Sequence, residues 1–340
     1  MTCVDLLVPG ITPPPAILAG AYPLPRLAAL ERLLAYAKRQ EAPFPSFEAA
    51  IFDRLGYPID AGGGLPVAAA THRVDFDDGH EGVWMRADPV VLRPDLGQLL
   101  LQNDQIDALT RDEARALIAE LNAGMADSGI VLELGRDSRR WYLRLPAVPS
   151  MVTQSPLAAL GRHVDPLVPR GLDAGFWHRV GNDLQMLLHG STVNAERQAR
   201  GLEAVNSLWF WGAGTLEQAA NRSPITVWSD DPLAQGLALA AGDSLRTLSP
   251  GEPADIRASL AGDTCIILGG GWRESRVDAP QAWEEVLRRL ESLWFEPILE
   301  LLRRRRIDRL RLHTLRHCFE LRPSDCRRFW RRPRPLSAPI

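Results

Sequence analysis

The stretch LLHGSTVNAERQARGLEAVNSLWFWGAG, residues 187–214, carries most of the fold information in this 340-residue chain. It begins at the end of an amphipathic helical pattern (176–189) and closes with an apolar run, Ser207 to Trp211, typical of a buried strand. Two more apolar runs follow, at 225–228 and 264–268, with helical patterns between and after them. Strands that alternate with helices predict an α/β fold with a mostly parallel sheet and helices on both faces.

Upstream of this stretch the pattern changes. Residues 4–8 read as a short buried strand that ends at Pro9-Gly10. Thr110 with Glu113 three residues later has the pattern of a capping box and predicts a helix start. Residues 130–134 and 141–145 read as two paired strands around a polar turn. The region from about 90 to 200 therefore reads as an inserted α+β segment.

The charge is distributed unevenly. Residues 303–334 contain thirteen Arg against three acidic residues, a net charge of +10, while the formal charge of the whole chain is −3. Such asymmetry can mark an interaction tail. It also fits a GC-rich genome in which Arg fills nearly every basic position, because Lys38 is the only lysine. We expect the Pro- and Arg-rich end, from Arg331, to be frayed.

Composition excludes several classes. The four cysteines are too few and too scattered for a disulfide framework, and they lack the close pairing of a zinc site. The N-terminus does not read as a signal peptide, and no apolar run reaches the ~18 residues of a membrane span. We therefore expect a cytoplasmic protein with no membrane partner.

Three further stretches accompany the first in a recognisable order: PSFEAAIFDRLGYPIDAGGGLPVAAA (45–70), GVWMRADPVVL (82–92) and RRWYLRL (139–145). Together the four resemble segments of the archaeal-type cofactor-independent phosphoglycerate mutases, of the alkaline phosphatase superfamily. A narrower set, WMRADPV, RWYL, NSLWFWG and a tail like FWRRPRPL, resembles the RpfE-type regulatory protein family, a divergent bacterial branch.

The resemblance implies an alkaline-phosphatase-like core made of residues 1–85 and 205–325. It implies an inserted α+β domain at 86–204, and a basic Pro- and Arg-rich tail remains at 326–340.

The resemblance does not carry the activity with it. The mutases use two divalent metals and a nucleophilic Ser, and here the first strand ends at Pro9 where they have a metal-binding Asp. Ser46 stands at the nucleophile position, but Phe47 replaces the Asp that follows it. The later ligand stretches fall at 269–278 and 312–317, which lack the expected carboxylates. We therefore expect no metal, no cofactor and no catalytic residue, with Ser46 as a helix N-cap.

Polar positions that the resemblance retains are of another kind. Arginines are suited to bidentate contacts with phosphate or carboxylate, and amides and imidazoles can complete such a site. The alternative is that the arginines form structural ion pairs, with Asp88 as one partner. The predicted ligand-binding residues are Arg86, Asp88, Arg140, His189, Asn194, Arg197 and Asn206.

Three functions remain open. The first is a catalytically degenerate mutase-like protein that regulates, or binds a phosphorylated or carboxylated metabolite, with an unknown protein partner. The second is an active metal-dependent phosphomutase or phosphatase with Ser46 and a rearranged site. The third is docking of nucleic acid or protein through the basic C-terminus, where nucleic acid is not the favoured partner. For the second function the metal candidates are His72, Asp75, Asp77 and His80.

Overall fold

The computed structural model describes residues 2–20, 22–59, 64–76, 82–95, 97–103, 106, 109–248, 256, 260, 262–277, 279–328 and 330–336. The chain forms two compact units. Unit 1 contains residues 1–58 and 218–340, and unit 2 contains residues 59–217.

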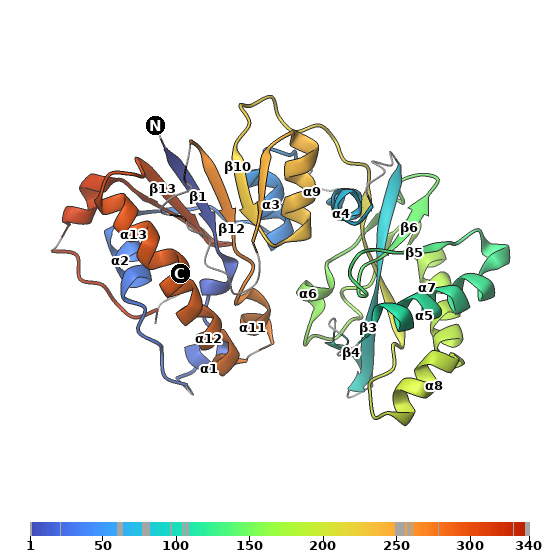
Figure 1. Ribbon diagram of the computed structural model, residues 1–340. Helices are drawn as coiled ribbons and strands as arrows, with labels where there is room; N and C mark the ends of the chain where they lie inside the picture. Colours follow the sequence, from blue (N-terminus) through green and yellow to red (C-terminus); the bar gives the residue numbers. More distant parts are fainter. Residues whose placement is uncertain are drawn as a thin grey trace. The chain divides into compact units, whose positions relative to one another are not determined.

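Unit 1 is built on a seven-stranded sheet (Figure 1). Five strands are parallel to their neighbours, and the last two pair antiparallel at one edge. The predicted α/β class with a mostly parallel sheet is therefore confirmed for this unit. In spatial order the strands are β11 (Ser244–Thr247), β10 (Thr226–Ser229), β12 (Thr264–Ile267), β1 (Cys3–Leu7), β13 (Arg309–His313), β14 (His317–Leu321) and β2 (Lys38–Glu41).

Helices cover both faces of this sheet. One face packs against α2 (Ala28–Tyr36), α12 (Pro280–Leu290) and α13 (Glu296–Arg303), and a shared apolar core joins them to β1 and β13. On the other face lie α3 (Phe47–Arg54) and α9 (Pro232–Ala241), which contact each other (Figure 1). Other helical segments among the described residues of unit 1 are η1 (Pro9–Ile11), α1 (Pro15–Leu18), α11 (Trp272–Arg276), η3 (Glu291–Phe295) and η4 (Pro323–Arg327).

Unit 2 has an antiparallel sheet centred on β3 (Val83–Asp95). The first half of β3 pairs with β6 (Trp141–Leu145) on one side and β9 (Ser207–Gly214) on the other. Its second half pairs with β4 (Gln98–Asn103), and β5 (Leu132–Leu134) extends the sheet beyond β6. A short pair, β7 (Met151–Val152) with β8 (Arg170–Gly171), stands apart from this sheet.

The helices of unit 2 include the predicted capping box. The backbone N–H of Glu113 donates to Thr110 Oγ1 at 3.2 Å, and the backbone N–H of Thr110 donates to Glu113 Oε2 at 2.9 Å. These two bonds satisfy donors that a helix start otherwise leaves open. The helices are α4 (Val67–Asp75), α5 (Arg111–Gly124), η2 (Ala126–Ser128), α6 (Pro156–Ala159), α7 (Ala174–His189) and α8 (Thr192–Ala199).

Two sequence predictions are wrong. We assigned 207–211 to the parallel sheet, but β9 pairs antiparallel with β3, because its apolar residues fill the core of unit 2. Residues 85 and 204, where the resemblance implies domain boundaries, both belong to unit 2. We also expected a frayed tail, yet Leu336 is 2% exposed and belongs to the core of unit 1. Among the described residues, no helix is long and apolar enough to cross a membrane.

Candidate functional site

In open α/β sheets, ligands bind at the carboxyl ends of the strands. At the carboxyl end of β1, the main chains of two loops pack against each other. The chain leaves β1 through the buried turn Pro9–Ile11. A Cβ placed on Gly10 would lie 2.3 Å from the carbonyl oxygen of Gly270. The indole Nε1 of Trp283 donates to the carbonyl oxygen of Gly10 at 2.7 Å. Two loops thus touch through their main chains at Gly10, which directly follows Pro9, the residue that the sequence resemblance places where the mutases have a metal ligand.

Ser46 begins α3 as its N-cap, as predicted. Its Oγ accepts the backbone N–H of Ala49 at 3.1 Å, which satisfies one of the open donors of the first turn. The next residue, Phe47, is 6% exposed, and its ring lies against Gly269 at the end of β12. An apolar ring therefore occupies the place beside Ser46 where a charged ligand would be needed.

Two carboxylates stand at the end of β10. Asp231 is the N-cap of α9 and accepts the backbone N–H groups of Leu233 at 2.8 Å and Ala234 at 3.3 Å. Burial raises the pKa of Asp231 to about 6, and the charges of Asp230 and Glu48 add to this effect. Burial also raises the pKa of Asp230. The pair resists carrying two negative charges.

These residues do not fit a two-metal centre. Divalent metals need several carboxylate, imidazole or thiolate donors around one point. Pro9, Phe47 and Gly269 offer no side-chain donor, and Asp231 is already engaged as a cap. Within the ranges that the structure describes, no group of three or more His, Cys, Asp or Glu could hold a metal ion. Asp77 and His80 lie outside those ranges.

A buried polar cluster that the sequence reading missed lies on the α3 face of the same sheet. Asp5 of β1 accepts a hydrogen bond from Arg311 at 2.6 Å and lies 2.9 Å from His313 Nε2. Arg54 of α3 approaches the same imidazole nitrogen at 3.4 Å. Burial lowers the pKa of His313, so the ring is neutral at pH 7. Asp5 was recognisable only as a single acid within an apolar strand.

The nearby thiol does not turn this cluster into a nucleophilic triad. Cys318 Sγ lies 4.0 Å from His313 Nε2, the same nitrogen that faces Asp5. A triad needs the acid on one imidazole nitrogen and the nucleophile on the other, so that a proton can pass through the ring. Burial also raises the pKa of Cys318, which keeps its sulfur protonated. The cluster is structural.

In unit 2, Arg86 and Asp88 form a buried ion pair. Arg86 Nε donates to Asp88 Oδ1 at 2.8 Å, and the two residues are 6% and 5% exposed. Trp211 Nε1 donates to the other carboxylate oxygen at 2.7 Å. The guanidinium also lies over the rings of Tyr142 and Trp211, 5.3 Å from each centroid. These contacts agree with the alternative given by the sequence, in which Arg86 forms a structural ion pair with Asp88.

Arg140 belongs to a second network. Its Nε donates to Asp75 Oδ2 at 2.8 Å, and the Tyr142 hydroxyl donates to the same oxygen at 2.7 Å. Burial opposes ionisation of Asp75, but the Arg140 guanidinium outweighs it and lowers the pKa of this carboxyl. His72, another metal candidate of the rearranged site, is stacked against Phe76 and Trp84. The structure thus places Asp75 with an arginine and His72 among aromatic rings.

Three more of the predicted residues bind groups of neighbouring segments in unit 2. Arg197 is fully buried, with its NH1 2.7 Å from Glu113 Oε2. Asn194 donates to the carbonyl of Val205 at 2.7 Å and accepts its N–H at 2.9 Å. Asn206 forms the same two-way pair with Leu92 of β3.

The structure brings three predicted residues into one pocket of unit 2. His189, Asn194 and Asn206 line a cavity of about 400 Å³. His189 is exposed, while the amides of both asparagines are occupied by backbone groups. Arg86, Arg140 and Arg197 do not line it. The structure therefore separates the predicted imidazole and amides from the predicted guanidiniums.

Comparison with known proteins yields a likeness of fold. Neither a protein-family model nor a curated protein matches the sequence. The structure superposes on a protein from Pyrococcus horikoshii with a TM-score of 0.54 and 11% identity, over 94% of this chain and 87% of that one. It is also similar to the cofactor-independent phosphoglycerate mutase from Thermoplasma acidophilum DSM 1728, with a TM-score of 0.41, 16% identity and coverage of 94% and 89%. The resemblance to the mutase is structural and distant.

Proposed function

We propose that this chain is a catalytically degenerate, phosphoglycerate-mutase-like protein that acts as a regulatory module by binding a metabolite. The observation that carries the proposal is the contact of Gly10 with Gly270. There, no Cβ can be added without displacing the opposite main chain. Gly10 directly follows Pro9, the residue at the position of the mutases' metal-binding Asp, so any side chain at Gly10 would need a different backbone at this turn.

The physical chemistry supports a binding role. Phosphate monoester transfer is among the slowest uncatalysed reactions known, and its enzymes supply up to about 10²¹-fold acceleration. Paired metals provide much of this by activating the nucleophile and neutralising charge on the transferred group. A Ser hydroxyl without metal or adjacent base is a weak nucleophile. Ser46, whose Oγ accepts the N–H of Ala49, has the partner of a helix cap.

The ligand that we propose is a phosphorylated or carboxylated metabolite. Its site would be the unit 2 pocket, where His189 and Gln198 stand beside Asn194 and Asn206. The ion-paired arginines would shape the unit around this pocket, since each already neutralises a carboxylate.

The deciding experiment compares wild type, Ser46→Ala and Ser46→Asp in an assay of 2- and 3-phosphoglycerate interconversion with added Mn²⁺. We expect no turnover from any of them. Ser46→Ala should lose about 1 kcal/mol of stability, and Ser46→Asp should keep it, because Asp is an equally good N-cap. Turnover by wild type that Ser46→Ala abolishes would overturn the proposal. In parallel, calorimetry with 3-phosphoglycerate on wild type and His189→Ala tests the pocket.

A further inference from the structure

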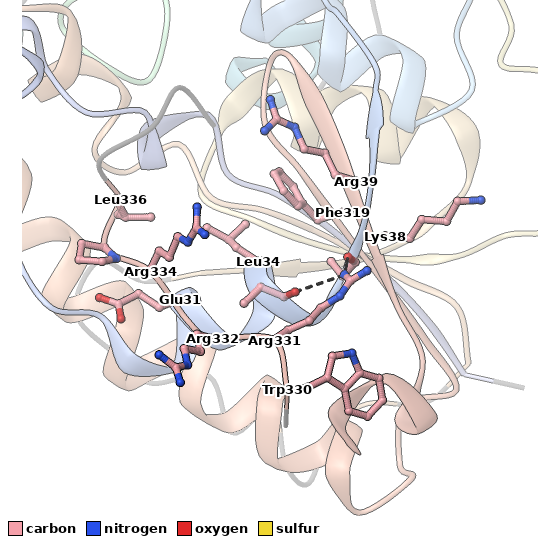
Figure 2. Close-up of a pocket in the computed structure, with 13 residues that line it drawn as sticks. Glu31, Leu34, Lys38, Arg39, Phe319, Trp330, Arg331, Arg332, Arg334 and Leu336 are labelled. Carbon is pink, nitrogen blue, oxygen red and sulfur yellow. Dashed lines mark hydrogen bonds between the residues drawn. The ribbon is translucent and has the colours of Figure 1, made fainter. Parts of the chain in front are cut away.

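A second, larger pocket lies in unit 1 and is far more basic. It has a volume of about 810 Å³ and is lined by residues of α2 and β2, by Phe319 of β14 and by residues 330–332 and 334–336. We call it the tail pocket. Figure 2 shows its side chains, which come from segments nearly 300 residues apart in the sequence. Five cations line it: Lys38, Arg39, Arg331, Arg332 and Arg334.

The only carboxylate of the lining is already neutralised. Glu31 forms a two-point pair with Arg26, with both distances 2.8 Å, and this hydrogen bonding lowers the pKa of Glu31. Its side chain is 1% exposed, and Arg26 balances its negative charge. The pocket therefore has a strongly positive lining with no opposing free acid among the described residues.

Not every cation of the tail pocket is available to a ligand. Arg39 lies 2.7 Å from His317 Nε2, and Arg331 donates to the carbonyl of Ala37 at 2.8 Å. Lys38, Arg332 and Arg334 have no ion pair within the described part of the chain, and all three are exposed. These three cations give the lining of the cavity an excess of positive charge, which attracts anions.

The tail that supplies two of these cations is anchored at both ends. Arg328 donates to the carbonyl of Tyr36 at 2.8 Å, upstream of the pocket. Leu336, beyond the pocket, is 2% exposed in the core of unit 1. The segment that contains Arg332 and Arg334 is therefore held in place on both sides. Preorganised cations lose less conformational entropy on binding than cations on a free tail.

An aromatic ring completes the site. Trp330 lines the pocket and is 67% exposed. The other exposed aromatic side chain of the described residues, Phe176, is 46% exposed. A flat indole beside arginines is the combination on which nucleobases stack while cations hold phosphates. We propose that the tail pocket binds a nucleotide, with its phosphates at Lys38, Arg332 and Arg334 and its base on Trp330. The nucleotide is either free or part of a single strand of nucleic acid.

The test measures binding of three probes by calorimetry: ATP, inorganic tripolyphosphate and a ten-nucleotide oligothymidylate. The variants are Arg332→Ser/Arg334→Ser and Trp330→Ala. The matched control, Arg304→Ser/Arg306→Ser, removes two exposed arginines of the same basic segment that do not line the pocket. Unchanged melting temperatures show that the variants fold. Because Lys38 is the only lysine, its protection from acetylation, read by mass spectrometry, reports directly on the pocket.

We expect ATP or the oligonucleotide to bind at least tenfold more weakly to the pocket double variant and to Trp330→Ala, with less than twofold change in the control. Binding should protect Lys38. ATP binding alone identifies a free nucleotide, and oligonucleotide binding alone identifies a single strand. The proposal fails if neither probe binds, if both variants bind as wild type does, or if tripolyphosphate binds as tightly as ATP. These outcomes do not bear on the Ser46 experiment, which concerns another part of unit 1.

Discussion

Asp75 and Arg140, sixty-five residues apart in the chain, form a two-point pair in which Arg140 Nε lies 2.8 Å from Asp75 Oδ2. The Asp75 side chain is fully buried, and Gly135 lies so close that a Cβ there would be 2.4 Å from its carboxylate. The glycine therefore makes room for the acid, and the arginine neutralises it.

Replacing Arg140 with Ala should destabilise the protein by about 3–5 kcal/mol, because it leaves a buried carboxylate without its partner. Thermal or urea unfolding measures this. Arg139→Ala is the control. Its pair with Asp137 is more exposed, and such pairs contribute about 1 kcal/mol or less. If Arg140→Ala instead left stability intact and abolished metabolite binding, Arg140 would be a ligand residue.

Removing residues 332–340 should lower the melting temperature clearly, because Leu336 leaves the core with them. Leu336→Ala alone should cost about 2–3 kcal/mol, at the low end for buried Leu near a chain end. Arg334→Ala, which removes an exposed side chain of the same segment, should have almost no effect. Equal stability of the truncated and full-length proteins would show that the tail does not anchor unit 1.

Gly10→Ala should destabilise unit 1 by about 3 kcal/mol or more, because the new Cβ would lie 2.3 Å from the Gly270 carbonyl oxygen. Gly175→Ala is a useful comparison, since Gly175 lies in α7 and a Cβ added there would meet open space. That change should be neutral or stabilising by about 0.5–1 kcal/mol. If Gly10→Ala left the stability unchanged, the proposal of a catalytically degenerate site would lose its main support.

Asp231→Asn should change how stability depends on pH. The folded pKa of about 6 exceeds the unfolded value, so wild-type stability falls as pH rises from about 4 to 6, by at most about 3 kcal/mol from this group. Asn keeps the cap and cannot ionise. The stability of the variant minus that of wild type should therefore be larger at pH 8 than at pH 4. If the stabilities of variant and wild type changed in parallel with pH, the pKa of Asp231 would not be raised in the folded protein.

Local signals were read correctly where one segment contains the whole interaction. The capping box at Thr110 and the cap at Ser46 each need only neighbouring residues, and both are present. The apolar run of β9 predicted a buried strand, but such a run does not tell which sheet buries it. Its partner β3 lies more than 100 residues upstream.

Long-range polar and apolar contacts could not be predicted. Asp5 and His313 are separated by 308 positions, and neither has a local pattern that points to the other. Leu336 is one of few apolar residues in a tail rich in Pro and Arg, so composition indicated a solvated tail. The sequence predicted a ligand-binding role for Arg86, Arg140 and Arg197, and in the structure each forms an ion pair with a carboxylate. Their carboxylate partners at Asp75 and Glu113 come from other elements, which only the fold brings together.

The position of β2 at the end of the seven-stranded sheet has a consequence for association between molecules. Its pairing with β14 leaves the outer backbone edge without a strand among the described residues, and its four residues are all exposed. Open edges of this kind recruit strands from other chains and start aggregation. Lys38, Arg39 and Glu41 place charges along the edge that hinder such pairing. The charged residues of β2 therefore oppose edge-to-edge pairing of this sheet with the sheet of a second molecule.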